Sequence, residues 1–263
     1  TLDLEDLRRQ FTSRTRLVAL VHISNTLGCC NPVDEVVSLA SEHGALVLLD
    51  ACQSLAHKPV AVHQLGVDFL VGSSHKLCGP TGMGFLWAKE ALLEAMPPFL
   101  GGGEMIQDVF LDHSTWADLP HKFEAGTPAI GEAVGMGAAI SYLETVGLKA
   151  IQAWEAELTA HLFSRLQAID GVRILGPTPE QQPDRGALAT FLVEGVHAND
   201  IAAMLDLEGV CIRSGHHCCQ PLHRHYGVTA SARASLSFTS TVAEIDRFAD
   251  ELTSTLDFLR AHS

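Results

Sequence analysis

Short, mainly apolar runs separated by helical patterns constrain this chain more than any other feature of its sequence. The runs cover 17–23, 45–49 and 67–71, and a weaker one covers 84–87. A strand that is apolar at every position has no face suited to water, so it is expected to be buried on both faces. A helical pattern over 32–43, closed by Gly44, separates the first two runs. This order predicts an α/β fold with a mostly parallel sheet and helices on both of its faces.

The second half of the chain predicts a smaller α+β unit. Two helical patterns meet at Gly147, and they cover 129–146 and 148–169. The strands and helices expected beyond them are strands at 172–175, 188–193, 210–213 and 234–238, and helices at 197–208 and 241–260. We therefore expect a large domain over 1–147 and a small C-terminal domain over 148–263.

A long polar, glycine-rich loop is expected between the two halves, over 97–128. Loops of this length in compact domains are usually functional or disordered. The apolar side chains of Phe110, Leu111 and Trp116 argue against disorder. The leucine- and alanine-rich stripes over 129–168 are expected to form core or a dimer interface.

The composition argues against several classes of function. A net charge of −14 makes the chain a poor ligand for the phosphate backbone of a nucleic acid. No apolar run approaches the roughly 20 residues that span a bilayer, so we expect no membrane insertion. The seven cysteines are an odd, scattered set, which favours a reducing compartment over a disulfide framework. The N-terminus shows no secretory signal and no initiator methionine, so processing and truncation stay open.

Polar side chains follow the ends of three expected strands, namely Asn25, then Asp50 and Gln53, then Ser73, His75 and Lys76. The carboxyl ends of parallel strands are where such sheets bind ligands. A lysine in poorly solvated surroundings can act as a neutral Schiff-base nucleophile. An aspartate on the neighbouring strand suits the pyridine nitrogen of pyridoxal phosphate, which must stay protonated. A surface lysine at a strand end is the plain alternative for Lys76.

A second reactive cluster lies in Arg213-Ser-Gly-His-His-Cys-Cys-Gln-Pro-Leu-His. A cysteine flanked by two imidazoles and an arginine can be held partly as thiolate, its reactive form. The histidines and cysteines here also offer nitrogen and sulfur ligands for zinc. Adjacent ligands such as Cys218 and Cys219 fit poorly around one tetrahedral ion, so we expect no metal. We expect His223 and His225 to be solvated on a short helix.

The remaining cysteines have ordinary interpretations. Cys29 and Cys30 are expected to be small buried or loop residues. Cys52, Cys78 and Cys211 are expected to be packing residues.

Read together and in order, three motifs resemble the SufS-type (group II) cysteine desulfurases. They are Asp50-Ala-Cys-Gln-Ser, Ser73-Ser-His-Lys and Arg213-Ser-Gly-His-His-Cys. Three further segments agree with the resemblance, which runs through essentially the whole chain: Leu100-Gly-Gly-Gly-Glu-Met-Ile, Phe123-Glu-Ala-Gly-Thr-Pro-Ala and Ala232-Arg-Ala-Ser-Leu. These desulfurases are fold-type I pyridoxal-phosphate enzymes of the class V aminotransferase group, and the resemblance implies that fold here.

The resemblance implies how the cofactor would be held. Lys76 would form the Schiff base with pyridoxal 5'-phosphate, and Asp50 would pair with its ring nitrogen. Gln53 would hydrogen-bond the phenolic oxygen of the ring. Ser73 and His75 would bind the phosphate.

The resemblance also implies how the substrate would be handled. Cys218 would accept sulfur from L-cysteine as a persulfide, leaving L-alanine, while the released Lys76 amine acts as base and acid. Arg233 would grip the substrate carboxylate, and Arg213 and His217 would shape the pocket. Asn25 would contact cofactor or substrate.

The partners follow from the same resemblance. Thr127 would reach the phosphate of a partner subunit, which implies a homodimer. A SufE-like or SufU-like acceptor would receive the sulfur for iron–sulfur cluster assembly. Selenocysteine lyase activity is open, because selenium leaves by the same route. The expected location is the bacterial cytoplasm, with the plastid stroma as the alternative.

Two departures from the family affect these expectations. Cys219 stands where the family usually has a small residue such as alanine, and it could resolve a persulfide or simply fill space. The resemblance also begins partway into the large domain, and roughly the first third of the family's length is absent. Because the absent part supplies phosphate ligands, we expect this chain alone to bind the cofactor weakly.

Two other functions stay open. The chain could be an inactive fragment that docks a sulfur acceptor through the region around Cys218. It could also be another class V enzyme, such as an aminotransferase or a kynureninase-like enzyme, although those reactions need no nucleophilic thiol.

Overall fold

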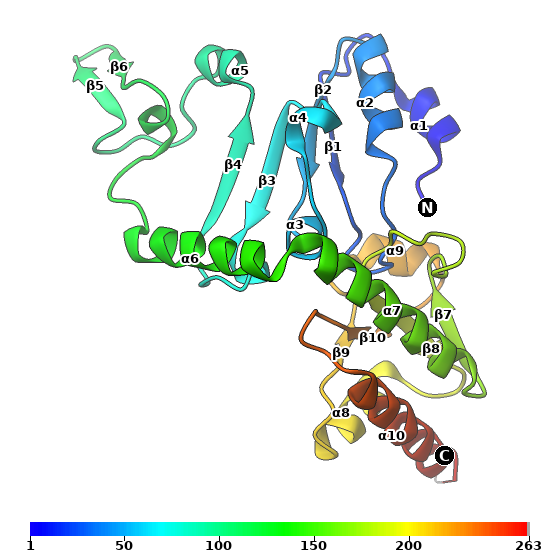
Figure 1. Cartoon of the computed structure of the whole chain (residues 1–263). Coiled ribbons are helices and arrows are strands. Elements are labelled where there is room, and N and C mark those ends of the chain that lie inside the picture. The colour runs from blue at the N-terminus through cyan, green and yellow to red at the C-terminus, as the bar shows by residue number, and fades with distance from the viewer. Residues whose placement is uncertain (262–263) are drawn as a thin grey trace.

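The computed structural model describes residues 1–261, which fold around two separate four-stranded sheets (Figure 1). The strands of the first sheet lie in chain order: β1 (Leu17–Val21), β2 (Leu46–Asp50), β3 (Phe69–Ser73) and β4 (Gly84–Ala88). The first three strands are parallel and β4 is antiparallel to β3. The predicted α/β class and mostly parallel sheet are therefore confirmed.

Short helices connect and cover these strands: α1 (Leu4–Gln10), α2 (Val33–Glu42), α3 (Ser54–His57), α4 (Val62–Leu65), the 3-10 turn η1 (Ser74–Lys76) and α5 (Glu90–Ala95). The helix predicted over 32–43 is α2, which begins directly after Pro32 and has acidic side chains in its first turn. Val33 and Ala40 of α2 pack with Val47 and Leu49 of β2 in one buried cluster.

The register of the first sheet sets the position of its polar strand ends. Val21 of β1 pairs with Asp50 of β2, which pairs with Val71 of β3. The carboxyl ends of the three parallel strands therefore lie at one edge of the sheet, as the sequence predicted.

The run over 17–23 was expected to be buried on both faces, and that expectation is wrong. Strand β1 covers only 17–21 and has a neighbour on one side, β2. Leu17 and Val21 are 48% and 38% exposed. One face of this edge strand is therefore left uncovered within the described residues.

The second sheet is antiparallel and has the order β7-β8-β10-β9. Its strands are β7 (Val172–Leu175), β8 (Leu188–Val193), β9 (Arg213–Gly215) and β10 (Ser231–Ser235). Three helices pack on it and a fourth follows β9: α7 (Leu148–Gln167), α8 (Ala198–Leu207), α10 (Val242–Ala261) and α9 (Gln220–His225). Their core includes the fully buried Leu162, Phe191 and Leu252.

Two strands of this sheet lie about three residues away from their predicted places. The aliphatic runs suggested strands at 210–213 and 234–238, but pairing joins Arg213 to Arg233 and Ser214 to Ala232. Val210, Ile212 and Leu236 flank the paired segments and pack partly buried against the core. The hydrophobic pattern therefore identified the residues that flank β9 and β10, while the paired residues of these two strands include serine and arginine.

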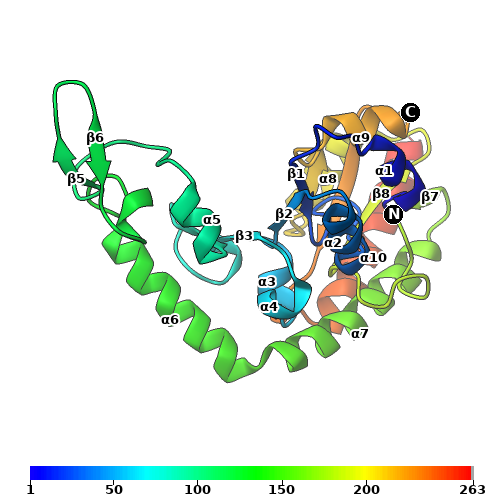
Figure 2. The same cartoon turned by 90° about the horizontal axis from the view of Figure 1, so that it is seen from above.

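Helix α6 (Ile130–Val146) meets α7 at Gly147, whose φ of +91° allows the bend between them. In both views the two helices run from the hairpin β5–β6 to the second sheet (Figures 1 and 2). The division into domains at this residue stays a prediction.

The segment over 97–128 is ordered, and it forms β5 (Ile106–Val109), β6 (Ser114–Trp116) and the 3-10 turn η2 (His121–Phe123). Together with the first turns of α6 it makes a projection that stands away from both sheets in both views (Figures 1 and 2). We call residues 97–134 the arm. Its exposed apolar side chains include Phe99, Leu111 and Val134.

A loop from the first sheet is fastened to the second unit by a buried arginine. One nitrogen of Arg185, Nη2, donates to the carbonyls of Leu27 and Leu188, at 2.8 Å each. The backbone nitrogen of Gly186 donates to the Gly28 carbonyl at 2.7 Å. A Cβ at Gly28 would lie 2.5 Å from the Arg185 guanidinium. These contacts fix the loop that carries Asn25 against the second sheet.

Replacing Arg185 by methionine should lower the free energy of unfolding by at least about 3 kcal/mol, because several buried carbonyls lose their donor. Urea unfolding followed by circular dichroism would measure the change. The matched control is Arg224→Met, since Arg224 is exposed on α9. Equal stabilities for the two variants would contradict the assignment of Arg185 as the fastening between the two units.

Candidate active site

The polar ends of β2 and β3 form the first half of the candidate site. The Asp50 carboxylate accepts a hydrogen bond from the backbone nitrogen of Cys52 at 2.9 Å. The Ser73 hydroxyl lies 2.8 Å from Nδ1 of His75. Lys76 is half-buried at the end of the turn that follows β3, and Gln53 is half-buried immediately before α3.

The charges of Asp50 and Lys76 act on the same neighbouring thiol. Burial, together with a hydrogen bond to Asp50 and its negative charge, raises the pKa of Cys52 to about 11, and the Lys76 charge opposes this rise. A carboxylate and an amine from neighbouring strand ends therefore both lie near the half-buried Cys52.

The second half of the site joins the two sheets through Asn25. Arg233 on β10 donates from Nη1 to the carbonyl of Asn25 at 2.8 Å. The Asn25 side chain donates from Nδ2 to the carbonyl of His217 at 2.8 Å. Residues that are 192 positions apart in the sequence are thus in direct contact.

Cys218 lies in the loop between β9 and α9, with its side chain exposed. Nη2 of Arg213 donates to its sulfur at 3.5 Å. His217 and Cys218 have φ values of +51° and +61°, which non-glycine residues rarely adopt. The exposed thiol is thereby presented on an unusual turn beside a permanent cation.

The imidazole of His217, one of the two that precede Cys218, carries no positive charge near pH 7. Burial and then, in decreasing order, the charges of Arg233, His223 and Arg213 lower its pKa to about 4. His217 is therefore neutral near pH 7, and Arg213 is the cation in contact with the thiol.

Thr127 is not brought together with these residues. It is exposed in the loop that precedes α6, on the arm. Its expected role at a partner's phosphate stays a prediction.

Sequence reasoning missed two members of the site, His223 and Ser231. His223 was expected to be solvated, but it is 2% exposed and lies 2.8 Å from the hydroxyl of the fully buried Ser231. His225 on the same helix is exposed, as expected. The spacing of these residues gave no signal, because the contact depends on where β10 passes behind α9. In residues 1–261, no three potential ligands among histidine, cysteine, aspartate and glutamate converge as they would around a metal ion.

The other cysteines differ in exposure, and Cys52 is half-buried. Cys29 and Cys30 are buried, which confirms the prediction for them. Cys78 and Cys211 are exposed, so their assignment as packing residues is wrong.

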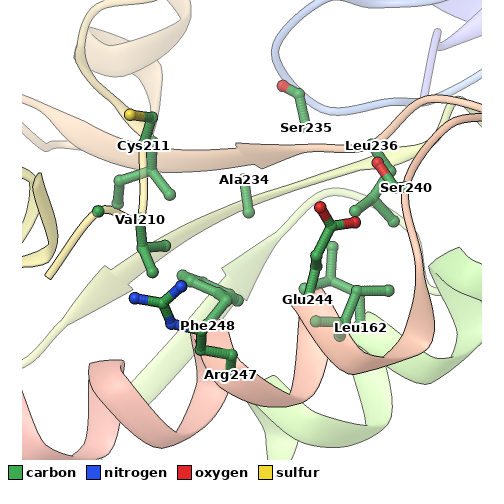
Figure 3. A pocket seen from close by; sticks show the side chains of 13 residues that line it. Leu162, Val210, Cys211, Ala234, Ser235, Leu236, Ser240, Glu244, Arg247 and Phe248 are labelled. Atoms are coloured by element: carbon green, nitrogen blue, oxygen red, sulfur yellow. The ribbon is translucent and has the colours of Figure 1, made fainter.

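A cavity of about 290 Å³ in the second unit contains none of the predicted site residues (Figure 3). Leu162, Phe248 and Ala234 contribute apolar side chains to its wall, while Arg247 and Glu244 contribute charged ones. We do not assign the chemistry to this cavity, because the amine, the carboxylate and the arginine-contacted thiol all lie outside it.

The comparison with known families decides the relationship. The family model for class-V aminotransferases matches residues 1–248. The chain belongs to the class-V aminotransferase family. Within this family the chain is a homologue of the pyridoxal-phosphate-dependent cysteine desulfurases, as the three motifs suggested.

Individual relatives agree with this placement. A probable cysteine desulfurase from Synechocystis is 54% identical over 258 residues, which are 98% of this chain and 61% of that protein. The cysteine desulfurase CsdA of Escherichia coli matches with a TM-score of 0.91 at 35% identity, covering 97% of this chain and 63% of that one. A C-DES mutant with glycine linked to its PLP cofactor shares the fold, with a TM-score of 0.81 at 23% identity over 95% of this chain and 63% of that one.

The chain spans about three fifths of the length of these relatives. Its residues nevertheless fit the cofactor of the family. Lys76 offers the amine, Asp50 the carboxylate for the ring nitrogen, and the bonded Ser73 and His75 offer donors for a phosphate. None of the helices over 1–261 combines the length and the apolar character needed to cross a bilayer.

The stability of the chain should fall as the pH decreases from 6.5 to 4. Burial lowers the pKa of His22 and of His217 from 6.5 to about 4, so the unfolded chain binds protons that the folded chain does not. Each residue should cost up to about 3 kcal/mol over this range and nothing above it.

Urea unfolding at a series of pH values would measure this slope. His22→Gln should flatten it, and His225→Gln, at an exposed position, should leave it unchanged. Identical slopes for the two variants would contradict the assignment of His22.

Proposed function

We propose that this chain carries the catalytic residues of a pyridoxal-phosphate-dependent cysteine desulfurase. The observation that carries the proposal is the exposed Cys218 thiol in contact with the Arg213 guanidinium. A nucleophilic thiol is needed to take sulfur from cysteine, whereas other class V reactions do not need one. In the net reaction, L-cysteine and the Cys218 thiol give L-alanine and a Cys218 persulfide, which balances all atoms.

Two arginines favour a substrate that carries a carboxylate. Arg213 and Arg233 face each other across β9 and β10. Burial and the Arg213 charge lower the pKa of Arg233. Within residues 1–261, neither guanidinium has a carboxylate as salt-bridge partner. A partly buried, uncompensated pair of cations is a site for an anion, and a guanidinium binds a carboxylate with two parallel hydrogen bonds.

The remaining roles follow from the residue types. Pyridoxal phosphate, when bound, would supply the electron sink that stabilises negative charge on the substrate carbons. Lys76 would hold and move the proton at those carbons, and Asp50 would keep the ring nitrogen protonated. Gln53 would bond the phenolic oxygen, Ser73 and His75 the phosphate.

Beyond this site, Asn25 would fix the substrate-side arginine through its carbonyl, and His217 would shape the pocket as a neutral ring. An exposed Cys218 can deliver its sulfur to a SufE-like or SufU-like protein for iron–sulfur cluster assembly. L-Selenocysteine would be a second substrate of the same residues, because it differs from L-cysteine only in having selenium in place of the sulfur that leaves. A reducing compartment such as the cytoplasm, or the plastid stroma, would keep this thiol free.

Alanine released from L-cysteine in the presence of added pyridoxal phosphate tests the function. Cys218→Ala should reduce the rate at least about 100-fold, because it removes the arginine-contacted thiol that takes the sulfur. Cys219→Ala is the matched control and should stay within about twofold of the unchanged chain. Lys76→Ala should lose the Schiff-base absorbance band.

Undiminished alanine release by Cys218→Ala would contradict the desulfurase assignment. A Schiff-base band without alanine release would favour the alternative, a module that docks the acceptor without turnover. Absence of the band in the unchanged chain would show that the cofactor needs residues beyond the three fifths present here.

We also propose that the arm pairs two copies of the chain. It carries Leu111 at 110% and Val134 at 70% exposure, and Thr127 lies between them in the sequence. Apolar side chains this exposed are typical of a surface that a partner covers. A dimer would place the Thr127 hydroxyl of one copy where it can serve the phosphate site of the other.

Light scattering after gel filtration should give about twice the chain mass of 28.2 kDa. Val134→Asp should shift the mass toward a single chain, because a buried unpaired charge opposes association. Leu207→Asp is the control, since Leu207 is 77% exposed on α8, away from the arm. A dimer that survives Val134→Asp would contradict the role of the arm.

A further inference from the structure

Three buried polar side chains form a connected chain behind Cys218. His217, Ser231 and His223 are 1%, 0% and 2% exposed. Nε2 of His217 lies 3.0 Å from the Ser231 hydroxyl, and Nε2 of His223 lies 2.8 Å from the same oxygen. One hydroxyl therefore links two imidazole rings that come from opposite sides of the Cys218 loop.

The acceptors at the ends of this chain fix where its protons lie. Nδ1 of His223 is 3.0 Å from the carbonyl of Cys219, and Nε2 of His217 is 3.1 Å from the carbonyl of Ser231. A carbonyl oxygen can only accept, so each of these nitrogens carries a hydrogen. In the neutral form of His223, Nε2 is bare and accepts the Ser231 hydroxyl. The network is thus directional, from serine to histidine to the backbone.

Hydrogen bonds from two side chains, His223 of this network and Asn25, hold the backbone on both sides of Cys218. After it, the Cys219 carbonyl is held by His223. Before it, the His217 carbonyl is held by the side chain of Asn25. Between these anchors, His217 and Cys218 adopt left-handed φ values of +51° and +61°. Side chains at such φ values crowd the backbone, so the turn persists only while its surroundings hold it.

We propose that Ser231 and His223 are positioning residues that keep the Cys218 sulfur against the Arg213 guanidinium. Without the hydroxyl, the ring of His223 loses its donor and can turn away from the Cys219 carbonyl. The turn then relaxes toward ordinary φ values, and the sulfur moves away from Arg213. A thiolate that leaves its cation is less favoured, so the thiol becomes less reactive.

The inference rests on the proposed function only for what Cys218 does with sulfur. The reactivity of its thiol can be measured without cofactor or substrate. The charged and titratable groups around the turn are Arg213 on β9, Arg233 on β10 and His223 on α9, together with His216, Cys219 and the neutral His217 of the turn itself.

The test is the rate of iodoacetamide alkylation of Cys218 between pH 5 and pH 9, followed by mass spectrometry of its peptide. Ser231→Ala and His223→Gln should each slow alkylation at pH 7 by about fivefold and move the midpoint of the profile to higher pH. The rates should converge with that of the unchanged chain at pH 9. His225→Gln, exposed on the same helix, should have no effect.

Protection of the buried Cys29 and Cys30 from alkylation, together with far-ultraviolet circular dichroism, reports whether each variant is folded. Ser231→Ala removes a single oxygen and is the decisive variant if His223→Gln does not fold. His223→Asn keeps a donor at the position of Nδ1, so it should slow alkylation less than His223→Gln. Folded Ser231→Ala with an unchanged Cys218 profile would overturn the proposal, whatever the assay for alanine shows.

Discussion

The candidate site depends on the fastening of one loop to a sheet that it does not belong to. The loop after β1 carries Asn25, while Arg233 and Cys218 come from the second sheet and its connections. Arg185 donates to backbone carbonyls on both sides of this junction and lies over the ring of Phe163 at 4.3 Å. Five fixed donors on one planar group suit a junction made of carbonyls, where no carboxylate is needed.

The second constraint is electrostatic and concerns a local excess of positive charge in an acidic chain. The net charge is −14, yet Arg213 and Arg233 lie side by side near the buried, neutral imidazole of His217. Such an arrangement costs stability unless an anion is bound, and the two anions that the proposed reaction offers are the substrate carboxylate and the Cys218 thiolate. Neutrality of His217 matters here, because a third cation would add to the repulsion. The buried serine–histidine network provides hydrogen bonds to the backbone beside Cys218.

Much of the fold was predictable because the relevant signals are local. The strand over 188–193 and the helix ending in Val146 follow directly from hydrophobic periodicity and a glycine. The strand ends with Asp50 and Ser73 were also predictable, because polar residues there interrupt aliphatic runs. The predicted positions of the strands near Arg213 and Arg233 were wrong. The polar residues there pair with the neighbouring strand, whereas the apolar residues that flank them lie outside the paired segments. The exposed face of β1 was missed as well, because a sequence does not report which strands have neighbours.

The sequence by itself determined the chemical types at the site: an amine and a carboxylate at neighbouring strand ends, and a thiol beside an arginine. These depend on residue identity and on the alternation of strands and helices, which are encoded locally. Only the tertiary structure decided that His217 is neutral, that His223 is buried against Ser231, and that Asn25 contacts both Arg233 and His217. The reason is that burial and hydrogen bonding between residues far apart depend on how the two units pack against each other. This packing leaves no periodic pattern in the sequence.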